Sequence, residues 1–332
     1  MKIKITSTLI VLAFFACSKE NTDTQTLTAS NRSGLITAID TVQIPLNDLG
    51  TSTFYGFMGG LYPGGVNNPS GAYGYDLNRA CKLIEPLDTF GNPSPNGKIV
   101  FISLGGSTSG HNMELLKTKT AGNPLTNPQL LLLKCSNGKR SASLNSQMNP
   151  NDEYWDHVTQ IITGGANSSY RQVQVIYLEA DDSSKNNIAF PQRAVKVKED
   201  LQECLRLYKK KFPNVKIVYV LGRTRTFGNQ ILYNREPSPY YFGWGCKWAI
   251  EDQINGVPGT EYKGKKPVSP MITWGFYQWA DSLPRKTDDF YWRQSETKDG
   301  LHANDVGQDT LTTRFQNFLL TDKHASIWYA AH

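Results

Sequence analysis

The sequence of 332 residues predicts an α/β fold in which helices cover both faces of a five-stranded parallel sheet. Five short segments are almost continuously apolar, as expected for strands that are buried on both faces. These segments are 98–104, 129–135, 173–178, 215–221 and 271–274. Helical segments separate most of them, and the alternation of strands and helices along a chain is typical of a parallel sheet with helical crossovers.

The helices are predicted from apolar residues that recur every three or four positions. The clearest stripe consists of Ala194, Val197, Leu201, Cys204, Leu205, Tyr208 and Phe212. Shorter helices are predicted at 154–162 and 244–254. Asn304 is a suitable N-cap for a final helix. One face of that helix carries Leu311, Phe315, Phe318 and Leu319.

The N-terminus has the pattern of a secretory signal. Lys2 and Lys4 precede an apolar run, and a small residue stands directly before Cys17. This junction resembles a bacterial lipoprotein signal, in which the cysteine is acylated, although an ordinary cleaved signal is the alternative. We expect a signal peptide at 1–16, lipidation at Cys17 and attachment of the protein to a membrane of the cell envelope.

Composition divides the rest of the chain. Residues 17–35 are rich in Ser, Thr and Asn and are expected to form a flexible tether. Residues 36–332 are expected to form a single domain. Its segment 43–97 is rich in Gly, Pro and Asn, which predicts an irregular structure there. We expect a monomer that is either periplasmic or exposed on the cell surface.

Composition also excludes several classes of protein. Hydrophobic residues make up 39% of the chain and charged residues 19%, which is typical of a globular domain and not of a disordered chain. The net charge of +6 is small, and basic residues do not cluster among aromatic ones, so we expect no nucleic-acid partner.

Four cysteines allow two disulfides or a set of buried free thiols. They are Cys81, Cys135, Cys204 and Cys246.

Candidate catalytic residues follow the predicted strands, because ligands bind beyond the carboxyl ends of strands in an open α/β sheet. Ser107 comes after the first strand and two glycines, at a turn into a helix whose backbone N–H groups can bind an oxyanion. Ser109 is the alternative nucleophile. Asp299 and His302 lie three residues apart before the final helix, so one loop can supply a general base and the carboxylate that orients it.

Together these residues resemble the SGNH (GDSL-type) hydrolase superfamily over 98–320, and the segment DGLHANDVG is the most specific part of the resemblance. The resemblance implies a flavodoxin-like three-layer sandwich. It also implies that Ser107 is the nucleophile, His302 the base and Asp299 its partner. Gly106 departs from the family pattern, because aspartate is usual at this position.

The resemblance further implies an oxyanion hole with three donors: the N–H of Ser107, a glycine after the second strand and an asparagine after the third. Gly138 corresponds to the glycine, while Asp181 stands where asparagine is usual. An ionised carboxylate cannot donate a hydrogen bond. The third donor is therefore missing, or comes from Asn186 or Asn187, or is replaced by Arg223.

The expected substrate class depends on aromatic residues. The segment 227–292 contains 15 aromatic residues among 66, about twice the average of the chain. Flat aromatic faces suit sugar rings, although such residues are also common in cores. The candidates for substrate binding are Arg223, Tyr240, Tyr241 and Trp279.

These observations predict a serine esterase that hydrolyses a small-molecule or glycan ester, such as an acyl group on carbohydrate, through a Ser-His-Asp triad. The mechanism requires no cofactor. We expect no metal, because the pair Asp181-Asp182 is best explained as a solvated or arginine-paired turn. The alternative is a catalytically inactive, lipid-anchored glycan-binding protein on the same scaffold.

Overall fold

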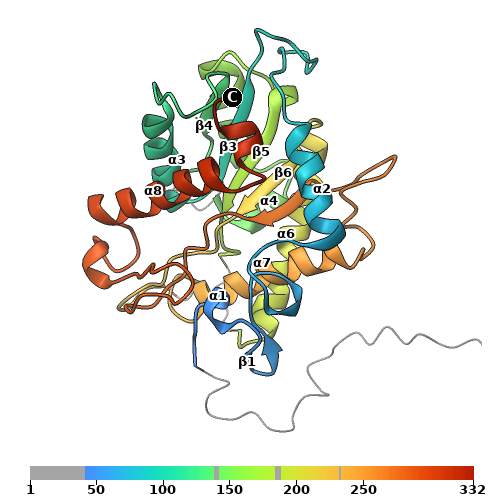
Figure 1. Cartoon of the computed structure of the whole chain (residues 1–332). Coiled ribbons are helices and arrows are strands. Elements are labelled where there is room, and N and C mark those ends of the chain that lie inside the picture. Colours follow the sequence, from blue (N-terminus) through green and yellow to red (C-terminus); the bar gives the residue numbers. More distant parts are fainter. Residues whose placement is uncertain (1–41, 138–141, 184–187, 232) are drawn as a thin grey trace, which may run out of the picture. The chain divides into compact units, whose positions relative to one another are not determined.

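The computed structural model describes residues 42–332 except 138–141, 184–187 and 232. Its centre is a parallel sheet of five strands in the order β4-β3-β5-β6-β7 (Figure 1). The strands are β3 (Ile99–Gly105), β4 (Leu130–Lys134), β5 (Val173–Glu179), β6 (Ile217–Val220) and β7 (Met271–Trp274). The five predicted strands are confirmed, and each pairing between neighbours is parallel.

Helices flank the sheet and bury it. The longer helices are α2 (Gly71–Lys82), α3 (Ser107–Thr120), α6 (Gln192–Lys211), α7 (Ser238–Ile254) and α8 (Asp305–Thr321). Helices α3 and α8 pack against each other, as Figure 1 shows, and α6 packs against α7. The ring of Phe315 contacts the rings of Phe101 and Tyr177 in the sheet. All residues of β3 and β5 are buried, which explains their continuous apolar character. The predicted three-layer α/β sandwich is confirmed.

Short elements complete the described part of the chain. The short helices and strands are α1 (Leu46–Leu49), β1 (Thr53–Phe54), β2 (Phe57–Met58), α4 (Leu144–Met148), α5 (Glu153–Thr159) and α9 (Ser326–Tyr329). Single turns of 3₁₀ or π helix occur at Pro63–Gly65, Gln160–Gly165, Tyr170–Gln172 and Gln294–Glu296. β1 and β2 pair with each other as an antiparallel hairpin apart from the main sheet.

Two helices differ from the prediction. The segment 43–97 is not irregular throughout, because α2 forms within it and buries Tyr73, Leu77 and Cys81 on one face. Helix α7 begins at Ser238, six residues before the predicted start. Pro239 lies in its first turn, where the missing N–H of proline costs no helical hydrogen bond. The predicted N-cap of α8 is confirmed, since the side chain of Asn304 accepts a hydrogen bond from the N–H of Gly307 at 3.0 Å.

The cysteines of the described residues are free thiols. Cys81, Cys135, Cys204 and Cys246 are all buried, and no two of them are bonded to each other. Burial raises the pKa of the Cys81 thiol to about 12 and raises the pKa of the other three thiols as well. Of the two alternatives left by the sequence, the structure therefore has the buried thiols, which act as small apolar core residues.

The predicted signal peptide, the tether and the lipidation site Cys17 lie outside the described residues and remain predictions. Within the described ranges, no helix has the length and apolar character that crossing a bilayer requires.

The backbones at the ends of β3 and β5 lie so close together that only glycine fits at position 105. Gly105 pairs with Glu179 in the sheet register and has a φ of 129°, in the region that favours glycine. A Cβ atom on Gly105 would lie 1.9 Å from the carbonyl oxygen of Glu179. Gly106 differs, since no atom lies within 4 Å of its Cβ position and its φ is −90°.

We expect Gly105→Ala to destabilise the fold by about 3 kcal/mol or more, because the new methyl group requires the two strands to separate and the backbone to strain. Gly106→Ala is the matched control and should change the free energy of unfolding by less than about 1 kcal/mol. Urea unfolding of the two variants measures the difference. Equal stability of both variants would contradict the close approach of β3 and β5.

Candidate active site

Ser107 is the first residue of α3, directly after the turn that ends β3. Gly106 is the N-cap residue, so the first backbone N–H groups of the helix lie next to the serine. Such groups have no partner within a helix and carry the positive end of its dipole. This position gives a hydroxyl that projects beyond the sheet beside donors that are suited to an oxyanion.

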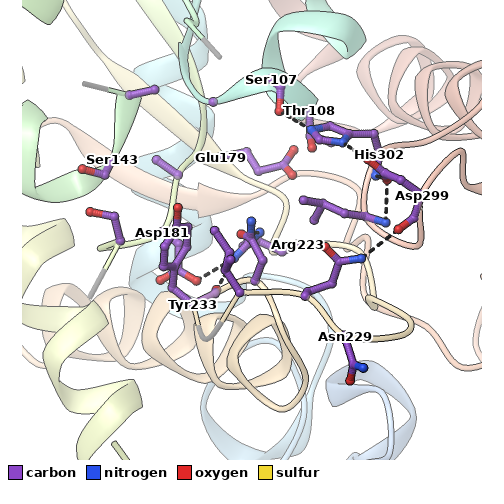
Figure 2. Close-up of a pocket in the computed structure, with 18 residues that line it drawn as sticks. Ser107, Thr108, Ser143, Glu179, Asp181, Arg223, Asn229, Tyr233, Asp299 and His302 are labelled. Atoms are coloured by element: carbon purple, nitrogen blue, oxygen red, sulfur yellow. Dashed lines mark hydrogen bonds and ion pairs between the residues drawn. The ribbon is translucent and has the colours of Figure 1, made fainter. Parts of the chain in front are cut away.

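His302 and Asp299 approach Ser107 from the loop before α8 (Figure 2). The Oγ atom of Ser107 lies 2.9 Å from Nε2 of His302. On the other side of the ring, Nδ1 of His302 lies 2.7 Å from Oδ2 of Asp299. The structure therefore brings the three residues of the predicted triad into one chain of hydrogen bonds, although 195 positions separate the serine from the histidine.

The local fold of the loop explains the Asp-x-x-His spacing. The other oxygen of Asp299, Oδ1, accepts hydrogen bonds from the N–H groups of Leu301 and His302 at 3.0 and 2.7 Å. Gly300 makes this turn with a φ of 80°, and its carbonyl accepts a hydrogen bond from the N–H of Phe227 at 2.7 Å. The carboxylate thus fixes both the loop and the ring that follows it.

The electrostatics of the loop favour an ionised Asp299. The hydrogen bond from the His302 ring, followed by that from the His302 N–H, lowers the pKa of Asp299 to about 2. An ionised carboxylate holds a proton on Nδ1 of the imidazole. Nε2 is then free to accept the proton of the Ser107 hydroxyl, which is the arrangement that general-base activation of serine requires.

The three residues line a cavity of about 490 Å³. Its walls come from the start of α3, from the end of β5, from the loops after β4, β5 and β6, and from the loop before α8. Figure 2 shows the labelled residues around it. Polar side chains predominate in the lining, which includes Thr108, Ser143, Glu179, Asp181, Ser183, Arg223, Asn229, Gln230, Tyr233 and Asn234. A cavity of this size can hold a small ester or one part of a larger one.

Asp181, a predicted member of the oxyanion hole, is held in an ion-pair network. Its Oδ1 lies 2.5 Å from a guanidinium nitrogen of Arg193, and its Oδ2 lies 2.6 Å from one of Arg223. Arg193 also pairs with Asp182, so the expected arginine-paired turn is present. Burial raises the pKa of Asp181, and the two arginines oppose that shift. Because both oxygens accept hydrogen bonds from cations, this side chain does not supply a donor to the cavity.

Glu179 is a residue of the cavity that the sequence did not single out. It is the last residue of β5, it is 5% exposed and it lines the cavity next to Gly106 and Ser107. Burial raises its pKa to about 7, while the hydrogen bond from Tyr177 and the charge of Arg223 act in the opposite direction. The available signal was an acidic residue that directly continues an apolar strand, which is unusual for a buried position.

The structure does not bring the predicted aromatic residues to the cavity. Tyr240 and Trp279 are 0% and 1% exposed, and their rings pack against each other in the core. Tyr241 is partly buried and lines a different cavity, together with Tyr55 and Glu236. The aromatic excess serves the packing of α7 and the loop after β7. Of the predicted substrate-binding residues, only Arg223 lines the cavity beside Ser107.

The remaining predicted residues are placed as follows. Ser109, the alternative nucleophile, is buried, and its hydroxyl donates to the carbonyl of Gly106 at 3.0 Å and contacts the Ser136 hydroxyl at 2.9 Å. Gly138, Asn186 and Asn187 lie outside the described residues. Among the residues that are described, no group of three or more His, Cys, Asp or Glu side chains could hold a metal ion.

Comparisons with known proteins add little to this geometry. No protein-family model matches the chain, and no curated protein matches it. Among solved structures, the chain is similar to a Bacteroides fragilis protein named "putative acylhydrolase". That similarity has a TM-score of 0.37 and 11% sequence identity, and it covers 75% of this chain and 97% of the other. Similarity at this level is too weak to assign an activity.

Because Glu179 is buried, we expect it to make the free energy of unfolding depend on pH. Its pKa of about 7 lies above the value of roughly 4.3 for an unfolded chain, so the unfolded state loses the proton first as pH rises. The wild type should therefore lose stability between about pH 4 and pH 7, relative to Glu179→Gln, which has no such proton. Over this pH range the free energy of unfolding of Glu179→Gln should rise by about 3 kcal/mol relative to that of the wild type. Urea unfolding of both proteins at pH 4.5 and pH 8 tests this, and a difference that is independent of pH would contradict it.

Proposed function

We propose that the protein is a serine hydrolase that cleaves ester bonds, with Ser107 as nucleophile, His302 as general base and Asp299 as its partner. The single observation that carries the proposal is the continuous chain of hydrogen bonds from Ser107 through His302 to Asp299, at 2.9 and 2.7 Å, on the wall of a cavity. A serine bonded to a histidine that is in turn bonded to an acid is the arrangement in which a Ser-His-Asp triad activates serine for acyl transfer.

The chemistry proceeds in two steps. The Oγ atom of Ser107 forms a bond to the carbonyl carbon of the ester while Nε2 of His302 takes the hydroxyl proton. The tetrahedral intermediate then breaks its bond to the alcohol, which leaves with the proton from His302. In the second step a water molecule attacks the acyl carbon while Nε2 of His302 takes its proton. The bond between that carbon and Oγ of Ser107 then breaks, Oγ takes the proton from His302, and the carboxylic acid leaves. The negative charge of Asp299 stabilises the imidazolium that forms in each step.

The oxyanion of each tetrahedral intermediate needs donors that are in place before the reaction. The N–H of Ser107 at the start of α3 is one such donor. Gly138 remains a proposed second donor on the strength of the family resemblance alone. Asp181 is not proposed as a third donor, since its carboxylate is occupied by Arg193 and Arg223.

The polar lining of the cavity favours, as substrate, an ester whose alcohol part is polar. Hydroxyl and amide side chains such as Ser143, Asn229 and Gln230 offer hydrogen bonds to a hydroxylated group. An acyl group on carbohydrate is compatible with such a lining. The alternative of an inactive glycan-binding protein was motivated by the aromatic residues and by aspartate at position 181. The aromatic argument is weakened, because Tyr240 and Trp279 are buried and cannot stack on a sugar.

Attachment to the cell envelope through a lipid on Cys17 is a separate part of the proposal, supported by the sequence alone. It would hold the catalytic domain near esters of the envelope, with the segment 17–35 as the tether.

The experiment that tests the triad is labelling with a fluorophosphonate, followed by mass-spectrometric mapping of the modified residue. We expect the label on Ser107, and we expect Ser107→Ala to abolish labelling and to lower the hydrolysis of 4-nitrophenyl acetate by a factor on the order of 10⁴ or more. Ser109→Ala is the control, because its hydroxyl binds Gly106 and Ser136 rather than His302. Full activity of Ser107→Ala would refute the assignment.

A further inference from the structure

The proposed oxyanion hole has backbone donors but no side-chain donor, because both oxygens of Asp181 pair with arginines. Glu179 is a second carboxyl group of the same cavity, which it lines together with Ser107 and His302. The sheet register pairs Glu179 with Gly105, two residues before the nucleophile. The N–H of Gly106 donates to the carbonyl of Glu179 at 3.3 Å. The backbone of Glu179 is therefore fixed relative to the turn that carries Ser107. Figure 2 shows its carboxyl group directed toward the Ser107–His302 pair.

A buried network determines which oxygen of Glu179 can face a substrate. The Tyr177 hydroxyl donates to Oε2 of Glu179 at 2.5 Å. The same hydroxyl accepts a hydrogen bond from the side-chain amide of Asn112 at 3.2 Å, and Oε2 of Glu179 is the acceptor that the structure gives for its proton. Because Oε2 accepts from Tyr177, the proton of a neutral Glu179 is on the other oxygen, Oε1.

The surroundings oppose ionisation of this carboxyl group. The titratable and charged groups around it are Tyr177 on its own strand, Arg223 after β6, Asp181 after β5, and Asp299 and His302 before α8. The nearest cation is committed elsewhere, since Arg223 bonds to Asp181, to the carbonyl of Tyr233 and to Asn234. Burial therefore dominates, and it holds the pKa of Glu179 at about 7, well above its ordinary value.

We propose that Glu179 is a catalytic residue which, as a neutral carboxylic acid, donates a hydrogen bond from Oε1 to the carbonyl oxygen of the ester as that oxygen becomes an oxyanion. It takes over the task that the carboxylate of Asp181 cannot perform. This inference rests on the proposed esterase function. A carboxyl group that is kept neutral by an apolar site is a known kind of oxyanion donor, and the loss of one such donor typically lowers kcat by a factor of roughly 10²–10³.

The pH profile of hydrolysis distinguishes this role from a structural one. Activity should fall as pH rises through about 7, because Glu179 then ionises, can no longer donate and repels the oxyanion. We expect Glu179→Gln, whose amide donates but does not titrate, to keep kcat within about tenfold and to lose the alkaline decline. Glu179→Leu, which has no donor, should lower kcat by roughly 10²–10³ with a much smaller effect on KM.

The assay is the hydrolysis of 4-nitrophenyl acetate from pH 5 to pH 9, recorded at a wavelength where nitrophenol and nitrophenolate absorb equally. Circular dichroism and thermal unfolding show whether each variant is folded. If Glu179→Leu does not fold, the pH profile of Glu179→Gln alone tests the inference. An alkaline decline that persists unchanged in Glu179→Gln overturns the inference, as does full kcat in a folded Glu179→Leu.

Fluorophosphonate labelling separates a failure of this inference from a failure of the esterase proposal. If Ser107 is labelled and Ser107→Ala is inactive while Glu179→Leu keeps full activity, then the triad stands and the role of Glu179 is refuted. If the wild-type protein is neither labelled nor active, both proposals fail together.

Discussion

The contact between the backbones of Gly105 and Glu179 is the constraint on which the rest of the site depends. The two residues pair at the ends of β3 and β5, and only a glycine can come so close to the carbonyl of Glu179. This approach sets the turn from which α3 starts and therefore the position of the Ser107 hydroxyl. The carbonyl of Gly105 also accepts a hydrogen bond from the N–H of Asn137 at 2.9 Å, which connects the loop after β4 to the same point.

Around this point the protein shifts the pKa values of two carboxyl groups in opposite directions. Asp299 is half exposed and receives hydrogen bonds from His302, and its pKa of about 2 keeps it ionised. Glu179 is buried beside an uncharged tyrosine, and its pKa of about 7 favours the neutral form. When the surroundings separate the pKa values of two carboxyl groups in one site, one group can act as an anion while the other acts as a proton or hydrogen-bond donor. Here the ionised acid orients the base, and we infer that the neutral acid donates to the substrate.

The sequence predicted the fold and the Asp299–His302 pair from local signals, whereas the meeting of Ser107 with His302, 195 positions apart, was implied by the family resemblance. The strands β3, β5 and β6 are buried on both faces, so their apolar runs are continuous and easy to detect. Asp299 and His302 are brought together by a turn of three residues, which the spacing itself indicates. The N-cap of α8 at Asn304 is a local signal of the same kind.

The predictions that the structure changed depend on tertiary contacts. Whether Tyr240 and Trp279 face a ligand or the core is decided by how α7 packs, and nothing in their spacing shows it. The pairing of Asp181 with Arg193 and Arg223 joins three separate segments of the chain. The state of Glu179 depends on burial by helices and loops that are remote in sequence. A sequence pattern can place such residues at the end of a strand, but it cannot say which of them is charged.

The most direct test of this account is a crystal structure of the protein after reaction with a fluorophosphonate. We expect a phosphorus atom bonded to Oγ of Ser107, with Nε2 of His302 beside it. We also expect a phosphoryl oxygen within about 3 Å of the Ser107 N–H. An adduct on another residue, or an unmodified Ser107 in crystals that contain the reagent, would contradict the account.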